Sequence, residues 1–393
     1  MVSDAPGSQS ALRRANSTLV LRALTQEGPS SHAELARATG LSRASVTNIV
    51  RELEATGAVR TYGEVRAGRH ARIAARVLPA KVVCAVNVGR DYLRVSLADL
   101  ESNVLVESEV LAAQGHEPQV CLDQVPVILD GLLATVGRDR EDLLGIVAGF
   151  PAPLDRTSRV IGTGALMRAW VGIDLQAELE RRTDVTVTVE NDANLGAIGE
   201  YRFGGYESEV ENLIFIRITT GIGAGLVLGG RLHRGGSGVA GEIGHTAVDP
   251  AGPLCRCGNR GCLERYVVAP TTLDLDRIDR AELRSIDDLI RLAIDGEITC
   301  RRVIDDMASH LGTAVANLCN TLNPDVVVLS GPFTAVGELL LGPVRREMER
   351  RSVPEAARAV RIGTSRLGPQ AEVLGALSWA VEIYADDPLA ATT

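Results

Sequence analysis

Four potential metal ligands constrain the fold of this chain more than any other feature of its sequence. Cys255, Cys257 and Cys262 lie within eight residues, and His245 precedes the first of them by ten. Thiolates and imidazole are the ligands that zinc prefers, and four of them close a tetrahedral structural site. The sequence therefore predicts that residues 245–262 fold around a structural Zn²⁺ ion.

Two acidic residues flank these ligands, Glu242 on one side and Glu264 on the other. A zinc ion that closes the loop brings the two carboxylates near each other, which is typical of one wall of a binding pocket. The alternative is a zinc ion that only staples the loop while both carboxylates are solvated.

The length of the chain and its cysteine pattern limit the class of protein. With 393 residues, we expect two or three domains of roughly 100–200 residues each. No apolar run approaches the roughly 20 residues that a membrane span needs, and the N-terminus does not resemble a secretory signal. The cysteines outside the cluster are scattered, so they do not suggest a disulfide framework. We therefore expect a cytoplasmic protein without a membrane partner.

Charge is divided unevenly along the chain. The net charge is −9, yet residues 1–80 hold 11 arginines and only 6 acidic residues. A basic head on an acidic body indicates a nucleic-acid-binding module.

The basic head has the order of a winged helix-turn-helix. A capping box at Ser31-His-Ala-Glu34 predicts the start of a second helix, and Gly40 predicts its end. A third helix begins after Ser42 and runs to about Thr56, with a buried stripe at Val46, Ile49, Val50 and Leu53. Two helices joined by a short turn that contains glycine form a helix-turn-helix.

The outer face of the third helix and a following hairpin carry the candidate DNA contacts. Small polar residues and arginine suit entry into a major groove, and residues 59–72 predict a β-hairpin wing whose tip reaches DNA. The predicted DNA-binding residues are Ser42, Arg43, Ser45, Thr47, Asn48, Arg51 and, at the wing tip, Arg69. The alternative for this segment is a three-helix protein-interaction domain with a solvated polar face.

The acidic body alternates strands and helices in two halves of similar order. The predicted strands are 82–88, 93–98, 104–111, 144–149, 185–190, 213–218 and 326–330, with helices at about 119–136 and 370–384. This pattern predicts a two-lobed α/β protein with a cleft between its lobes. Asn191 and Asp192 follow a strand directly, which is where ligands bind in such sheets.

Five segments of the body resemble one family in particular. They are Glu190-Asn-Asp-Ala-Asn194, Thr220-Gly-Ile-Gly-Ala-Gly-Leu-Val227, Ala240-Gly-Glu-Ile-Gly-His245, Cys255-Arg-Cys-Gly-Asn-Arg-Gly-Cys-Leu-Glu264 and Leu322-Asn-Pro-Asp325. Over nearly its whole length the chain resembles the ROK family (repressors, open reading frames and sugar kinases), and especially its winged-helix transcriptional regulators.

The resemblance implies an actin-like ATPase (RNase H-like) fold for the body. In the sugar kinases of the family, the Asn-Asp pair, the two Glu residues and the zinc-ligating His contact sugar hydroxyls, and the Asp is the general base. The implied sugar-binding residues here are Asn191, Asp192, Glu242, His245 and Glu264. Carboxylates are acceptors when ionised and sugar hydroxyls are donors, so the chemistry of these residues agrees with the resemblance.

The segments that would bind ATP depart from the kinase pattern. Where the kinases have Asp-x-Gly-Gly-Thr, this chain has Asn87-Val-Gly-Arg-Asp91, which replaces a carboxylate by an amide and puts an acid where a hydroxyl is expected. A Gly-Thr-Gly start has become Thr219-Thr-Gly221, and Pro332 removes a backbone donor from the adenosine-side loop. Phosphoryl transfer depends on positioning and electrostatics, so we expect no catalytic residue and no enzyme activity. If activity existed, Asp192 would be its base.

The sequence therefore predicts a sugar-responsive, DNA-binding regulator, most simply a repressor. Its partners are a double-stranded DNA operator and a sugar or sugar derivative, and its assembly is a homodimer or homotetramer. The expected domains are a winged helix-turn-helix at 1–78, a smaller lobe at 81–190 joined by the helix at 370–385, and a larger lobe with the zinc site at 191–369. The alternatives are an active sugar kinase with an appended DNA-binding head and a carbohydrate-binding scaffold that is independent of DNA.

Overall fold

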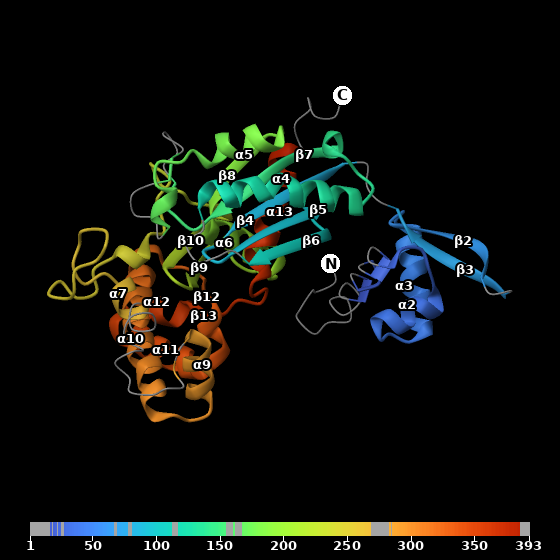
Figure 1. Cartoon of the computed structure of the whole chain (residues 1–393). Helices are drawn as coiled ribbons and strands as arrows, with labels where there is room; N and C mark the ends of the chain where they lie inside the picture. Colours follow the sequence, from blue (N-terminus) through green and yellow to red (C-terminus); the bar gives the residue numbers. More distant parts are fainter. Residues whose placement is uncertain are drawn as a thin grey trace.

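The head of the molecule is a helical pair followed by a hairpin (Figure 1). The computed structural model describes residues 16–17, 19–21, 23–24, 27–66, 69–77, 81–111, 117–154, 160–161, 167–268, 283 and 285–385. The elements of the head are β1 (Ser30–Ser31), α2 (His32–Thr39), α3 (Arg43–Ala55), β2 (Val59–Arg66) and β3 (Arg69–Arg76). Antiparallel pairing of β2 with β3 forms the predicted wing, and β1 extends that sheet.

The ends of both head helices follow from their sequence. Ser31 accepts a hydrogen bond from the backbone of Glu34 at 3.3 Å, and the Glu34 carboxylate accepts one from the Ser31 backbone at 2.7 Å, so the predicted capping box is confirmed. Gly40 ends α2 at φ 71°, a left-handed conformation that glycine adopts without strain. Ser42 caps α3.

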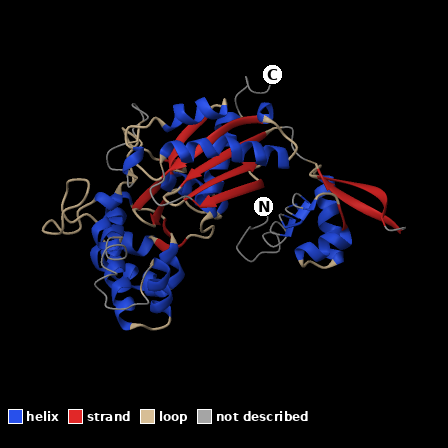
Figure 2. Ribbon diagram, viewed as in Figure 1, coloured by secondary structure: helices blue, strands red, loops and turns tan. Residues whose placement is uncertain are grey.

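Two five-stranded sheets with the same strand order form the body (Figure 2). The first runs β6-β5-β4-β7-β8 and the second runs β11-β10-β9-β12-β13. In each sheet the first three strands along the chain are antiparallel and the last two are parallel to the first. The strands are β4 (Val82–Val88), β5 (Tyr92–Ala98), β6 (Val104–Leu111), β7 (Leu143–Phe150), β8 (Val187–Asn191), β9 (Leu213–Ile218), β10 (Ile222–Leu228), β11 (Arg231–Leu232), β12 (Val326–Ser330) and β13 (Arg361–Thr364).

Helices cover both sheets, and two of them lie between the sheets. The first half holds α4 (Pro118–Thr135) and α5 (Leu175–Thr183), and the second holds α7 (Glu264–Val267), α9 (Ile286–Ile294), α10 (Ile298–Leu322), α11 (Glu338–Arg351) and α12 (Pro354–Ala359). The helix α6 (Asp192–Phe203) packs on β9 and β10, while α13 (Gln370–Tyr384) packs on β4, β7 and α6. The helix α13 thus contacts the first sheet as well as α6, and the division of the body into lobes, with the C-terminal helix assigned to the smaller one, stays a prediction.

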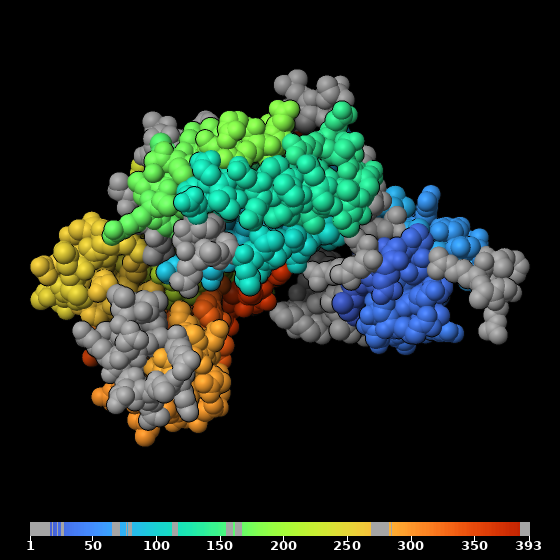
Figure 3. Space-filling view, in the orientation of Figure 1, coloured from blue at the N-terminus to red at the C-terminus, as the bar shows by residue number. Residues whose placement is uncertain are grey.

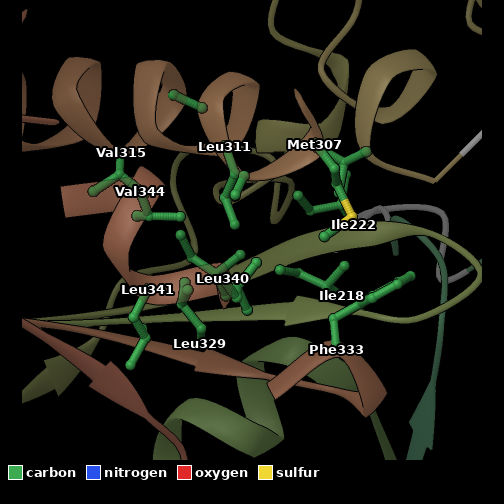
Figure 4. Packing of buried hydrophobic residues seen from close by; sticks show 14 of the residues in the cluster. Ile218, Ile222, Met307, Leu311, Val315, Leu329, Phe333, Leu340, Leu341 and Val344 are labelled. Atoms are coloured by element: carbon green, nitrogen blue, oxygen red, sulfur yellow. The ribbon is translucent and has the colours of Figure 1, made fainter. Parts of the chain in front are cut away.

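A large apolar core holds the second sheet against its helices. Figure 4 shows this packing, in which β9, β10 and β12 contribute Ile218, Ile222 and Leu329, and α10 and α11 cover them. Ile218 and Ile222 are both buried, and the turn that joins them is residues 219–221. The core therefore fixes the ends of a turn that lines the candidate site.

The structure adds elements that the sequence reading did not name. The helix α6 starts directly after Asn191, and the glycine-rich stretch after Thr220 is mostly the strand β10. No helix among the described residues is long and apolar enough to cross a membrane. The space-filling view shows the body as the larger mass, with the blue head beside it (Figure 3).

Candidate functional site

A cavity opens between the start of α6 and the loops of the second half. Its empty volume is about 520 Å³ and is open to solvent. All five predicted sugar-binding residues line it. The lining residues are Pro151, Ala152, Pro153, Asn191, Asp192, Ala193, Arg217, Thr219, Thr220, Gly221, Ile222, Gly223, Glu242, His245, Arg256 and Glu264.

Asn191 and Asp192 form the N-terminus of α6. The Asn191 amide oxygen accepts from the backbones of Ala193 and Asn194 at 2.9 and 3.3 Å, and its nitrogen donates to the Ala152 carbonyl at 3.1 Å. Asn191 is therefore a helix cap first, with most of its hydrogen-bonding capacity used by the protein. Asp192 is buried, and one of its oxygens accepts from the Ala193 backbone at 2.8 Å.

An arginine that the sequence analysis did not single out holds the second oxygen of Asp192. Arg217 comes from β9, and its Nη1 lies 3.1 Å from Asp192 Oδ2. Its Nε forms an ion pair with Glu372 of α13. The signal was visible in the sequence, because Arg217 is a single charge within the apolar strand Leu-Ile-Phe-Ile-Arg-Ile.

The two glutamates have different surroundings. The Glu264 carboxylate accepts from Arg256 at 2.6 Å, so a side chain of the cysteine loop neutralises it. Within the described part of the chain, the Glu242 carboxylate makes no hydrogen bond or ion pair, although it lines the cavity. Burial, together with the nearby charges of Asp192 and Glu264, raises the pKa of Glu242 to about 7. Glu242 is therefore the carboxylate that is free for a ligand.

The four predicted metal ligands come together. One ligand atom from each of His245, Cys255, Cys257 and Cys262 lies within 4.8 Å of all the others. Cys257 Sγ lies 3.6 Å from Cys262 Sγ, and Cys255 Sγ lies 3.7 Å from His245 Nδ1. Zinc–sulfur bonds of about 2.3 Å in a tetrahedron separate two sulfurs by roughly 3.8 Å, so the donors fit a metal ion. None of the seven cysteines forms a disulfide, and all of them lie within the described residues.

The geometry of His245 joins the metal centre to the cavity. Its Nδ1 faces the cysteine thiols, and the side chain also lines the cavity. When one ring nitrogen binds a metal, the other is left to make a hydrogen bond.

A second cavity borders the first and is lined by residues of the three segments that the sequence analysis compares with ATP-binding motifs. Its empty volume is about 820 Å³. The cavities share Pro151, Arg217, Thr219 and Thr220, and the second is also lined by Gly89, Arg90, Asp91, Tyr92, Met167, Ile286, Asp287 and Pro332.

The first of these segments, residues 87–91, makes a backbone hydrogen bond to the residue that follows it. The Gly89 backbone N–H donates to the carbonyl of Tyr92 at 2.9 Å. Asn87 is 3 % exposed, and its side-chain amide has no hydrogen-bond partner among the described residues. Two acidic side chains, Asp91 and Asp287, line the same cavity.

The predicted DNA-binding residues in and next to α3 differ in their exposure to solvent. Arg43, Asn48 and Arg51 are exposed, as is the cap residue Ser42. Ser45, Asn48 and Arg51 lie on one face, beside Asn16.

Two of the predicted DNA contacts differ from the others. The Thr47 hydroxyl donates to the carbonyl of Arg43 at 2.9 Å and lies 3.1 Å from Nδ1 of His32 in α2, so the protein itself uses this group. Arg69 begins β3, and its side chain, like residue 68 at the wing tip, lies outside the described residues.

Comparison with known families agrees with this architecture. A family model described as the ROK family matches residues 83–383, and a model described as winged helix-turn-helix DNA-binding matches residues 13–60. The chain belongs to the ROK family and carries an N-terminal winged helix-turn-helix.

Individual relatives include both regulators and kinases. The chain is 29 % identical over 380 residues to the xylose repressor of Bacillus subtilis, covering 96 % of this chain and 98 % of the repressor. A solved ROK family transcriptional regulator, a homologue of the Escherichia coli Mlc protein, superposes with a TM-score of 0.67 at 26 % identity, covering 94 % of this chain and 96 % of that one. A ROK glucokinase from Streptomyces griseus, solved with glucose and AMPPNP, gives 0.66 at 26 % identity, covering 77 % of this chain and 99 % of that one.

Proposed function

We propose that this protein is a sugar-responsive transcriptional repressor. The winged helix-turn-helix binds an operator, and the body binds a sugar or sugar derivative in the first cavity and thereby changes operator affinity. The observation that carries the proposal is the convergence of three carboxylates and His245 on one cavity, in a chain that also has a DNA-binding head. The full-length similarity to a xylose repressor supports it.

The carboxylates give this cavity the chemistry of a sugar site. Asp192 and Glu264 are each held by an arginine and present their remaining lone pairs as acceptors for hydroxyl groups. Glu242 has its whole carboxyl group available, and the free nitrogen of His245 adds a further hydrogen bond. Asn191 contributes mainly by capping α6 and thus holding Asp192 at the cavity.

The metal in this proposal is a structural Zn²⁺ ion bound by His245, Cys255, Cys257 and Cys262. Bound zinc fixes the conformation of the loop and the orientation of the His245 ring. Arg256 lies between two of the ligands and pairs with Glu264. The same loop therefore places two groups of the sugar site.

We propose further that the protein transfers no phosphoryl group. Phosphates need a cradle of backbone N–H groups and a cation, whereas the Gly89 N–H is used internally and Asp91 and Asp287 line the second cavity. A homodimer that reads two half-sites is the expected assembly, because helix-turn-helix proteins usually bind DNA in this way.

Fluorescence anisotropy with DNA from upstream of the protein's own gene tests the regulator function. We expect tight binding that weakens steeply with salt and that falls at least tenfold when one sugar of a panel of D-xylose, D-glucose, N-acetyl-D-glucosamine and their phosphates is added. Binding no tighter than to a shuffled sequence, or no response to any sugar, would contradict the proposal. A matching thermal-shift screen measures sugar binding directly.

One observation favours a second candidate, an active sugar kinase with a DNA-binding head. Asp192 lines the first cavity, and Arg217, to which it is paired, lines both cavities, so a sugar hydroxyl and a nucleotide would meet there. A coupled assay of ADP release over the same unphosphorylated sugars separates the two functions. We expect a rate equal to the sugar-free background, whereas turnover with a phosphorylated product would establish the kinase.

A further inference from the structure

Arg217 is a buried charge that the proposed sugar contacts leave unexplained. It lies in β9 between apolar residues, and its side chain is only 15 % exposed. It is also one of the residues that the two cavities share. An arginine in this position costs desolvation free energy unless charged partners compensate it.

Each nitrogen of the Arg217 guanidinium has a partner. Nη1 lies 3.1 Å from Asp192 Oδ2 and donates to the Thr219 hydroxyl at 2.8 Å. Nε and Nη2 both face the carboxylate of Glu372, with Nη2 at 3.4 Å. The Tyr92 hydroxyl donates to the same carboxylate at 3.5 Å. The cluster thus joins β9, α13, β5 and the N-terminus of α6.

Two carboxylates face one guanidinium in this cluster. Burial alone would lower the pKa of Arg217, but Asp192 and Glu372 outweigh burial and raise that pKa well above its usual value. Burial raises the pKa of Glu372, and Arg217 opposes this rise. The ionised cluster has one net negative charge, which disfavours a phosphate beside it.

We propose that the Arg217–Glu372 pair is the positioning element of the sugar site, which fixes Asp192 as an oriented acceptor and makes the site selective for one sugar hydroxyl. This inference rests on the proposed sugar-sensing function. Asp192 Oδ1 is held by the Ala193 backbone and Oδ2 by Arg217, so the carboxylate has one orientation. Glu372 holds Arg217 in turn, from a different helix.

A fixed acceptor discriminates between hydroxyl positions because a misplaced hydroxyl leaves a buried charge without its hydrogen bond. The same ion pair places the guanidinium of Arg217, which lines the second cavity, against Oδ2 of Asp192. The pair therefore favours recognition of a hydroxyl over its transfer to a phosphate.

The test compares three full-length variants with a matched control. Arg217→Met removes the guanidinium at similar length, and Arg217→Lys restores a positive charge without the planar fork. The double variant Arg217→Met/Glu372→Gln avoids leaving Glu372 as an uncompensated buried charge. The control is Arg202→Met, which breaks a different ion pair of α13. That pair joins Arg202 of α6 to Glu382, and neither residue lines either cavity.

Isothermal titration calorimetry with D-xylose, D-glucose, N-acetyl-D-glucosamine and their phosphates, and then with the monodeoxy derivatives of whichever sugar binds, supplies the readout. In the wild type, removal of the sugar hydroxyl that donates a hydrogen bond to Asp192 should weaken sugar binding at least tenfold, as expected for a hydrogen bond to a charged group. In Arg217→Met and in the double variant, the parent sugar should bind at least tenfold more weakly and the deoxy discrimination should fall below threefold. Arg217→Lys should recover part of the sugar affinity and part of the deoxy discrimination, and Arg202→Met should change neither of these two quantities.

The outcomes separate this inference from the function on which it rests. If the wild type binds no sugar, the sugar-sensing function fails and the inference falls with it. If the wild type binds a sugar and the folded Arg217→Met or double variant keeps both its affinity and its deoxy discrimination, only the inference is overturned. A loss of affinity with unchanged discrimination also overturns it, because it indicates a merely structural role.

Discussion

Glu242 differs from the other acidic residues of the cavity because no arginine in the described part of the chain forms an ion pair with it. Its pKa is raised to about 7 by burial and by the carboxylates of Asp192 and Glu264, with Arg256 opposing. The folded protein therefore keeps this proton in the interval between an ordinary glutamate pKa and about 7, while the unfolded chain has lost it. Since the folded state binds more protons there, the free energy of unfolding from this group falls as pH rises across the interval.

Sugar binding should depend on pH through Glu242. An ionised carboxylate is a better acceptor for a hydroxyl than a neutral one, so sugar affinity should rise as pH increases through about 7 and then level off. Binding should release protons in this range, which calorimetry in buffers of different ionisation enthalpy measures. Glu242→Gln should flatten the profile, and an unchanged profile in that variant would refute the assignment.

The variant Cys257→Ser tests the candidate metal site by replacing one ligand sulfur with oxygen. It is the exposed member of the four ligands, so Cys257→Ser alters the apolar core little. We expect loss of bound zinc, a lower melting temperature and loss of sugar binding together, because the loop also places His245 and Arg256. Metal content by mass spectrometry and a thermal-shift assay measure these effects. Cys300→Ser, at a buried cysteine outside the cluster, is the control that should retain zinc.

Among the secondary-structure elements, those with strong local signals were predictable from the sequence. The capping box of α2, the apolar stripe of α3 and the β-branched run of β4 each specify their element, and the repeated order of strands specified two lobes. The residues of the candidate metal site were predictable because four residues of two rare types, histidine and cysteine, cluster within 18 positions. The helix α6 was not predictable in this way, because its glycines and polar residues interrupt the apolar pattern that would indicate a helix.

Interactions between distant elements could not be predicted in this way. Arg217 and Glu372 are 155 residues apart, and only the packing of α13 against the body brings them together. An isolated charge in an apolar segment indicates a buried pair, but it does not identify the partner. The same holds for α3. The sequence of α3 alone does not show that the Thr47 hydroxyl lies beside His32, because that contact depends on how α2 packs against α3.

The exposed face of α3 should carry the specificity for DNA. Asn48→Ala should weaken operator binding by about tenfold and reduce discrimination against other sequences, because asparagine pairs with base edges. Arg51→Ala should weaken specific and non-specific binding alike and lower the salt dependence. Arg302→Ala, at an exposed arginine of α10, is the control. Equal losses on all sequences for Asn48→Ala would place that residue on the phosphates instead.

For the whole molecule, the two halves of the body are joined near the proposed sugar site by further contacts. Glu190 is the penultimate residue of β8, where it accepts from the Asn191 backbone and the Asn194 amide, both at 2.9 Å. Its other oxygen pairs at 2.6 Å with Arg234, which follows β11 and lies over the ring of Trp379 in α13. In the proposed function, sugar binding at Asn191 and Asp192 would therefore act on residues that connect both sheets and the helix between them.

If sugar and operator favour different states of one molecule, their effects on each other must be reciprocal. A ligand shifts an equilibrium only by its difference in affinity for the two states. If the sugar lowers operator affinity by a certain factor, the operator must therefore lower sugar affinity by the same factor. We expect this factor to be at least ten, which corresponds to about 1.4 kcal/mol. Anisotropy with and without saturating sugar gives the first factor, and calorimetry with sugar in the presence and absence of saturating operator gives the second. Agreement within twofold supports a single coupled switch, whereas a tenfold effect in one direction with none in the other would mean that the sugar acts on operator binding at some other site.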